Sequence, residues 1–116
     1  MAPLNECAYL ESKSIPEHLG IMIARGRVVR IDVFAPGIST RNGASVGDTE
    51  ERIKQLYPGQ ITVEPHHYLA ESGHYLNYFP GKPKRAYGMV FETDGNIVTS
   101  FRVGTREAIA LVEGCS

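Results

Sequence analysis

Residues 87–103 read YGMVFETDGNIVTSFRV, two β-rich runs on either side of Asp94-Gly95. An Asp-Gly pair between such runs is a strong short-range signal for a β-hairpin. Residues 20–34 have the same form, GIMIARGRVVRIDVF, with Arg25-Gly26 at the expected turn. The two stretches form a weak internal repeat, although any two hairpins share this pattern. If the repeat is real, both hairpins belong to one antiparallel sheet.

The second run of the earlier hairpin alternates in hydrophobicity with a period of two, which is typical of a half-buried strand. One side of that strand is therefore expected to carry apolar residues: Val29, Ile31 and Val33. The other side carries a mixed set: Val28, Arg30, Asp32 and Phe34. We expect arginines such as Arg30 and Arg102 to lie on solvated faces, because the thirteen acidic residues of the chain balance its basic ones.

Two helices are expected between and after these strands. A Gly- and Ser-rich loop at 36–47 precedes a helix over about 48–57, for which Asp48 is the expected N-cap and Glu51 completes a capping box. A short C-terminal helix is expected over 105–112, capped by Thr105. The predicted fold class is therefore α+β: an antiparallel sheet of about five to seven strands, built from hairpins, with one main helix packed on it.

The chain has 116 residues, which suits one domain over 1–116, with residues 1–6 expected to be a flexible N-terminus. It contains no apolar run long enough to span a membrane. Its formal net charge is −1, which argues against nucleic-acid binding, because phosphate contacts need a basic excess. No cofactor-binding motif is present, and none is expected.

Cys7 and Cys115 stand almost at the two ends of the chain. Because the ends of a compact domain often lie close together, a disulfide between them is the preferred interpretation. Two buried reduced thiols, or a metal or redox pair, are the alternatives. A disulfide predicts a secreted or periplasmic protein. Met1-Ala2-Pro3 does not start an apolar signal sequence, so a mature form with an added initiator methionine is expected.

Residues 66–79 are rich in tyrosine and histidine and read as two strands around Glu71-Ser72-Gly73. Alternation places Tyr75, Asn77 and Phe79 on one face of the second strand, opposite to His74, Leu76 and Tyr78. Some of these rings must fill the core, and any left outside would form an aromatic binding surface. The candidate binding residues are His67, Tyr68, His74, Tyr75 and Tyr78.

The same region raises a metal site as an alternative. His67 and His74 across a hairpin, with Glu64 or Glu71, would offer three ligands to Zn²⁺ in a small metal-dependent hydrolase. His66 and His67 point to opposite faces, however, so only one of them can join His74. The simpler interpretation is a solvated or stacked histidine pair, and a pH-sensitive or ligand-binding role is the third.

The chain contains two further short motifs. Residues 43–47 read GASVG and match G-x-S-x-G, but the expected strand ends well before Ser45 and the chain is too short for a hydrolase sheet, so a loop before a helix is the preferred interpretation. Residues 82–85 read KPKR and form a local basic patch that would suit an anionic envelope polymer.

Residues 44–59 read ASVGDTEERIKQLYPG, a small-residue loop, a Gly-Asp pair, a helix and a Tyr-Pro-Gly ending. This segment resembles bacterial envelope proteins that share the topology of the β-lactamase-inhibitor protein and of the SmpA/OmlA assembly lipoproteins. Residues 91–95, 98–100 and 112–115 resemble the tails of uncharacterised secreted bacterial proteins of that shape. The resemblance covers about residues 37–116. The chain has room for about one two-hairpin unit, so no inhibitory residue carries over.

The resemblance implies an extracytoplasmic protein that binds something. With no acid-base or nucleophile constellation in the sequence, the leading expectation is a non-enzymatic binding protein, either a protein inhibitor or an envelope-associated module. Its partner would be a protein or an envelope polymer. The alternatives are the metal-dependent hydrolase and a structural domain of a larger envelope assembly, which an exposed edge strand would favour.

Overall fold

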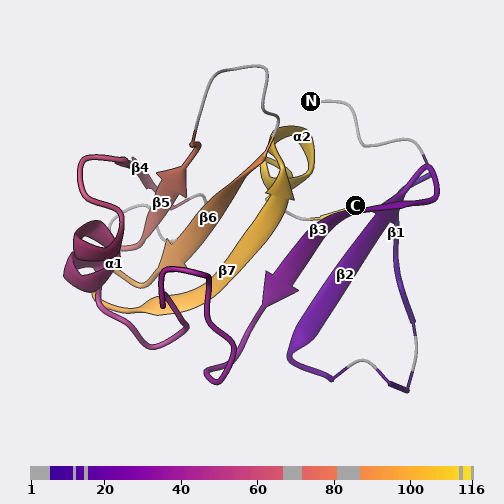
Figure 1. Cartoon of the computed structure of the whole chain (residues 1–116), viewed down its shortest axis with the longest axis horizontal. Coiled ribbons are helices and arrows are strands. Elements are labelled where there is room, and N and C mark those ends of the chain that lie inside the picture. Colours follow the sequence, from indigo (N-terminus) through magenta and orange to yellow (C-terminus); the bar gives the residue numbers. More distant parts are fainter. Residues whose placement is uncertain are drawn as a thin grey trace.

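The computed structural model of the chain describes residues 6–11, 13–14, 16–66, 72–80, 87–112 and 114–115. It contains one seven-stranded sheet and two short helices (Figure 1). In chain order the elements are β1 (Ala8–Tyr9), β2 (Leu19–Ala24), β3 (Arg27–Val33), α1 (Glu50–Leu56), β4 (Ile61–Pro65), β5 (His74–Tyr78), β6 (Tyr87–Thr93), β7 (Val98–Thr105) and α2 (Arg106–Ile109).

The sheet is antiparallel throughout, with the strand order β1-β2-β3-β7-β6-β5-β4. Both predicted hairpins are confirmed, and they lie side by side through the pairing of β3 with β7. Arg25 and Gly26 have φ values of 51° and 75°, as a tight two-residue hairpin turn requires. At the other turn, Asp94 Oδ1 accepts from the backbone N–H groups of Asn96 and Ile97. Local turn chemistry therefore sets both hairpins.

The predicted α+β class is wrong, because the fold is mostly β. α1 has seven residues and α2 has four, so neither forms a substantial layer. α1 begins later than expected, because Thr49 rather than Asp48 is its N-cap and accepts from the N–H of Arg52. The Asp48 carboxylate instead accepts from the N–H of Ser45 in the preceding loop. Thr105 caps α2 as predicted, but that helix ends at Ile109.

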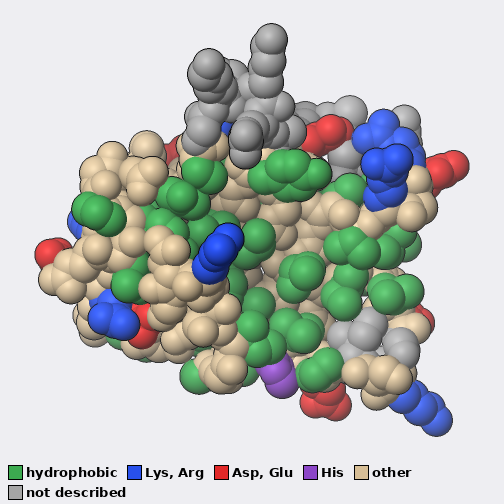
Figure 2. All heavy atoms as spheres, viewed as in Figure 1, with side chains coloured by type: hydrophobic (Ala, Val, Ile, Leu, Met, Phe, Trp, Pro, Cys, Tyr) green, Lys and Arg blue, Asp and Glu red, His purple; other side chains and the backbone are tan. Residues whose placement is uncertain are grey.

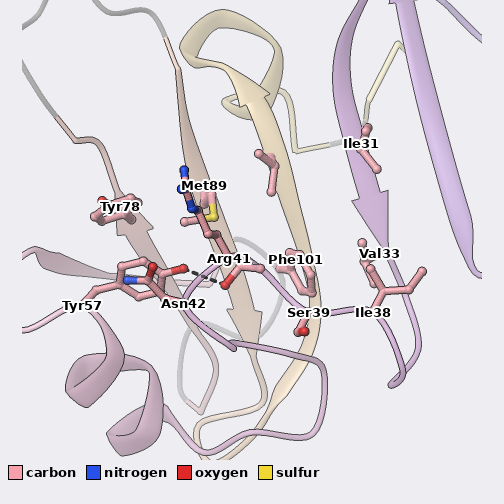
Figure 3. A pocket seen from close by; sticks show the side chains of 12 residues that line it. Ile31, Val33, Ile38, Ser39, Arg41, Asn42, Tyr57, Tyr78, Met89 and Phe101 are labelled. Atoms are coloured by element: carbon pink, nitrogen blue, oxygen red, sulfur yellow. Dashed lines mark hydrogen bonds between the residues drawn. The ribbon is translucent and has the colours of Figure 1, made fainter.

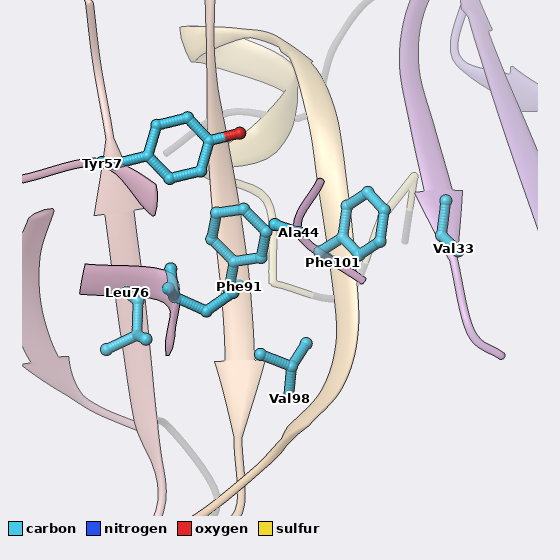
Figure 4. Packing of buried hydrophobic residues seen from close by; sticks show 8 residues of the cluster. Val33, Ala44, Tyr57, Leu76, Phe91, Val98 and Phe101 are labelled. Atoms are coloured by element: carbon cyan, nitrogen blue, oxygen red, sulfur yellow. The ribbon is translucent and has the colours of Figure 1, made fainter. Parts of the chain in front are cut away.

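One face of the sheet, here called the α1 face, carries Leu76, Phe91 and Phe101 and holds the main hydrophobic core. Ile53 of α1 and Ala44 of the preceding loop are fully buried against it (Figure 4). α1 and that loop thus cover part of this face and close the core around the aromatic rings.

The opposite face, here called the α2 face, carries Asp32, Tyr75 and Arg102 and lies under α2 and the C-terminal segment. Arg30 and Arg102 are 5% and 4% exposed, so the expectation that they lie on solvated faces is wrong. Arg30 pairs with Asp32 at 2.8 Å and also donates to the carbonyl oxygens of Ala108 and Leu111. Arg102 donates to the carbonyl oxygen of Ile109, so both arginines fasten the chain after β7 to the sheet.

The side assigned to Val29 is also corrected. Ile31 and Val33 lie on the α1 face as predicted, whereas Val29 packs with Met22 and Ala24 on the α2 face. Val28, predicted on the side of Arg30, pairs with Ile23 and lies on the α1 face instead. The pairing of β2 with β3 shifts register at this point, since Met22 faces Arg30 while Ile23 faces Val28. An extra residue in one strand of a ladder reverses the alternation beyond it.

The predicted disulfide joins Cys7 and Cys115, whose Cα atoms are 5.5 Å apart. The bridge packs beside Met22 and Ala24, and close by the Tyr9 hydroxyl donates to Asp32. It fastens the C-terminal segment to the β1–β2 edge of the sheet. Within the described residues, no helix is long and apolar enough to cross a bilayer.

Candidate functional site

An open apolar pocket of about 460 Å³ lies on the α1 face, beside the part that α1 covers (Figure 3). Its floor is built from apolar side chains of four neighbouring strands: Ile31, Val33, Phe101, Val103, Met89 and Tyr78. Its wall comes from residues 38–42 and from Tyr57 at the end of α1. In Figure 2, hydrophobic side chains gather over the middle of this face, above β3 and β7.

The register of the sheet explains why this floor is open. One cross-strand row, Leu19, Val33, Phe101, Phe91 and Leu76, lies largely beneath α1 and its loop. The next row on the same face is Ile21, Ile31, Val103, Met89 and Tyr78. No helix lies over this second row in the described structure, and Ile31 and Val103 remain 40% and 38% exposed. An exposed apolar row of this kind on a sheet face is a candidate binding surface.

The loop that forms the pocket wall is braced at several points. The hydroxyls of Thr40 and Tyr57 share a hydrogen bond of 2.7 Å, and the N–H of Ala44 donates to Thr40 Oγ1. Asn42 Nδ2 donates to the carbonyl oxygen of Leu56. Burial raises the pKa of Tyr57, although the hydrogen bond with Thr40 opposes this, so the phenol stays neutral. The wall is therefore fixed before any ligand arrives.

Arg41 follows Thr40 in this braced loop and lines the pocket. It is exposed, and it is the one charged side chain among the lining residues, all of which belong to the described part of the chain. Among the described residues, no carboxylate forms an ion pair with it. The pocket thus combines an apolar floor with a single cation at its rim.

The predicted binding residues do not form one site. Tyr78 lines the apolar pocket and packs on Tyr57 with ring centroids 4.5 Å apart. Tyr75 lies on the α2 face, 8% exposed, so the predicted alternation of β5 is confirmed and separates the two rings. His74 Nδ1 lies 2.7 Å from the Glu50 carboxylate and so joins β5 to α1. His67 and Tyr68 lie outside the described residues.

A second, polar cluster occupies the α2 face. Glu92 bonds to His66 Nε2 at 2.7 Å and also forms an ion pair with Arg102. The Tyr75 ring lies 4.6 Å from the His66 ring and 5.7 Å from the Arg102 guanidinium. Burial lowers the pKa of Arg102, while Glu92 opposes that shift, and an arginine remains charged at neutral pH. These groups satisfy one another, as buried charges in a structural network do.

A smaller cavity of about 250 Å³ adjoins this cluster, with Glu64, Asn77 and Phe79 among its lining. Asn77 Nδ2 donates to the Glu64 carboxylate. Glu64 therefore lies on the α2 face, whereas His74 reaches α1 on the opposite face, so the structure does not bring these two predicted metal ligands together. His67 and Glu71, the other two residues of that hypothesis, lie outside the described residues.

The remaining sequence hypotheses fall in loops. Ser45 of the GASVG motif forms an isolated bridge with Ser39 and helps to close the loop before α1, in agreement with the loop interpretation. The basic patch at 82–85 lies outside the described residues. The sequence reasoning missed Arg41 and Met89 as site residues. Strand alternation could have indicated Met89, which lies on the same face as Phe91, whereas Arg41 lies in a loop and no sequence pattern indicates it.

The chain matches no protein-family model, no curated protein and no solved structure at a significant level.

Proposed function

We propose that this chain is a non-enzymatic, extracytoplasmic binding protein, and that its binding site is the apolar pocket on the α1 face. The observation that carries the proposal is the pocket itself, an opening of about 460 Å³ with an apolar floor. This volume lies within the range of ligand pockets, which combine mostly apolar walls with few polar groups. Phe101 and Met89 in its floor offer surface to a ligand and carry no group suited to acid-base or nucleophilic chemistry.

The disulfide supports the compartment in this proposal. Bridges such as Cys7–Cys115 form and persist in secreted and periplasmic proteins, and they are rare in the cytosol. The resemblance of residues 44–59 to envelope proteins points the same way. A protein of this kind acts by holding a ligand or partner, so its activity would be measured as binding rather than turnover.

The neutral fluorescent probe N-phenyl-1-naphthylamine tests the site. We expect saturable binding with one probe per chain, seen as enhanced emission, because the probe would bury its rings against the pocket floor. Val103→Glu should abolish this binding, because it puts a carboxylate into the apolar row at a half-exposed position. Val63→Glu is the matched control, since Val63 is 43% exposed on the edge strand β4 and does not line the pocket.

The proposal fails if the folded protein binds no probe, or if the Val103→Glu variant binds it as well as the Val63→Glu variant does. Circular dichroism and a thermal melt establish that each variant is folded. Because both substitutions add one negative charge at a half-exposed strand position, the comparison separates loss of the pocket from a general effect of charge.

A second candidate is the binding of a protein partner through the same face. It is favoured by exposed apolar side chains that continue beyond the pocket, at Val28 (56% exposed) and Tyr87 (66% exposed). A partner of that size would bury Tyr87, whereas a small ligand would not need it, because Tyr87 does not line the pocket. Tyr87→Ser should weaken protein binding and leave the affinity for the neutral probe unchanged.

A further inference from the structure

We propose that the pocket on the α1 face binds a single-chain anionic amphiphile, with its carboxylate at Arg41 and its hydrocarbon chain along the open apolar row. This inference rests on the proposed function and adds the chemical class of the ligand. Two observations carry it: the charge at the rim of the pocket, and the shape of the pocket floor.

Arg41 differs from Arg30 and Arg102 in its exposure and in its charged neighbours. Arg30 and Arg102 are buried and each has a carboxylate partner, Asp32 and Glu92 respectively. Arg41 is exposed at the rim of an apolar pocket and has no carboxylate partner among the described residues. A guanidinium presents a fork of donors that matches a carboxylate in a bidentate pair. A monoanionic head group therefore complements this rim, and a cationic one would be repelled.

The position of Arg41 is also set in advance. Thr40, the residue before it, is tied to Tyr57 and to the N–H of Ala44, and Asn42, the residue after it, is tied to Leu56. Figure 3 draws Arg41 between Tyr78 and Phe101, in front of Met89. Because both of its neighbours are held, little backbone order is lost when a head group binds.

The floor of the pocket suits a chain rather than a compact ring system. Within the pocket, the apolar row from Tyr78 through Met89 and Val103 to Ile31 crosses four neighbouring strands. At a strand spacing of about 4.8 Å, this part of the row is about 14 Å long. A volume of about 460 Å³ lies in the lower half of the range for ligand pockets, which fits one chain better than two.

Three amphiphiles with the same ten-carbon chain test the assignment: decanoate, decan-1-ol and decyltrimethylammonium. Each is titrated at low salt against the protein loaded with N-phenyl-1-naphthylamine, with decanoate and decyltrimethylammonium kept below their micelle concentrations and decan-1-ol below its solubility limit. We expect decanoate to displace the probe at the lowest concentration and decyltrimethylammonium at the highest. Shortening the carboxylate to octanoate should weaken binding by about fourfold for each methylene removed.

Arg41→Met should weaken decanoate by roughly three- to tenfold, towards the affinity of decan-1-ol, and should leave decan-1-ol unchanged. Arg27→Met is the matched control, because Arg27 is an exposed arginine at the start of β3 that does not line the pocket. Raising the salt concentration should reduce the advantage of decanoate over decan-1-ol in the wild-type protein and not in the Arg41→Met variant.

The outcomes separate the two proposals. The anionic-amphiphile proposal is overturned if decanoate binds no tighter than decan-1-ol, or if Arg41→Met weakens both equally. It is also overturned if Arg27→Met weakens decanoate as much as Arg41→Met does. If the neutral probe still binds saturably, the apolar site is retained. Failure of the probe and of all three amphiphiles to bind the folded protein overturns the proposed function as well.

Discussion

The Nε–H of Arg102 donates to the carbonyl oxygen of Ile109 across 2.6 Å. Ile109 is the last residue of α2, so this bond satisfies a carbonyl group that the helix itself leaves without a partner. Arg30 adds a second donor to the carbonyl oxygens of Ala108 and Leu111, each of which also accepts a backbone N–H. Two arginines from the middle of the sheet thus hold a helix of four residues that is too short to be stable alone.

Arg102→Met should lower the free energy of unfolding by about 3 kcal/mol, because it leaves Glu92 beside His66 without its cation and frees the end of α2. Urea denaturation followed by circular dichroism measures the change. Arg52→Met is the control, since Arg52 is an exposed helix residue whose nearest carboxylate is 4.0 Å away, and its loss should cost less than about 0.5 kcal/mol. Equal midpoints for the two variants would show that the buried pair is not structural.

Gly104→Ala should destabilise the protein by about 3 kcal/mol. A Cβ atom at Gly104 would lie 2.2 Å from the carbonyl oxygen of Val29 and 2.7 Å from the Cα of Arg30, and these backbone atoms cannot give way without breaking the β3–β7 pairing. At Gly20, the closest atom is Tyr9 Cε1 at 3.2 Å, which belongs to a side chain that can move. Gly20→Ala should therefore cost less than about 1 kcal/mol. The melting temperatures of the two variants, compared with that of the wild-type protein, test this difference in stability.

Replacing both Cys7 and Cys115 by serine should lower the free energy of unfolding by about 4 kcal/mol, because the bridge closes a loop of 108 residues in the unfolded chain. Adding reductant should lower the free energy of unfolding of the wild-type protein by the same amount, seen as a lower urea midpoint. The serine variant should not respond to reductant. Thiol titration of denatured, unreduced protein should find no free thiol. Two free thiols would contradict the bridge and the compartment inferred from it.

Glu50 links stability to pH. Burial raises the pKa of its carboxyl, but the hydrogen bonds with Thr93 and His74 outweigh this and lower the pKa below the ordinary value of 4.5. A carboxyl whose pKa is lower in the folded state stabilises the protein above its unfolded pKa, and this contribution is lost as the pH falls through the folded value. The free energy of unfolding should therefore drop as the pH falls below the ordinary carboxyl pKa of 4.5, and Glu50→Gln should show a shallower decline there. Glu51→Gln, at an exposed position of α1, should keep the wild-type slope.

Metal analysis of protein purified without a histidine tag should find no stoichiometric Zn²⁺. The physical reason is the separation of His74 and Glu64 on opposite faces of the sheet, where each has another partner, Glu50 and Asn77. One equivalent of metal per chain, lost in the His74→Ala variant, would revive the hydrolase alternative. His66→Ala gives the comparison for the α2 face, where His66 bonds to Glu92.

Local rules in the sequence predicted much of the fold. Arg25-Gly26 and Asp94-Gly95 define their turns through residues that lie next to one another, and Thr105 caps α2 through a bond to Ala108, three residues away. The terminal disulfide also follows from a general property of compact domains. These features were predictable because short-range geometry or chain position decides them.

The site depends on long-range pairing, which the sequence does not display. Arg30 looks like a surface residue in its strand, and only the return of the chain at Ala108 and Leu111 makes its burial favourable. Likewise, alternation correctly separated Tyr75 from Tyr78, but which face stays open depends on how far α1 and its loop reach across the sheet. Arg41 gains significance only because residues 38–42 of this loop line the pocket together with side chains of β6 and β7.

The pairing of β3 with β7 has a consequence for the speed of folding. Each hairpin can close within its own short segment, whereas β3 meets β7 only after a long stretch of chain, with α1 and three other strands in it, has been brought round. Bringing distant residues together costs chain entropy before their contacts contribute any stabilising energy, so such contacts slow folding. In the oxidised chain the ends are already tethered, which reduces that entropic cost. The pairing of β3 with β7 at the centre of the sheet therefore limits the folding rate. The disulfide between Cys7 and Cys115, which tethers the two ends of the chain, should raise that rate.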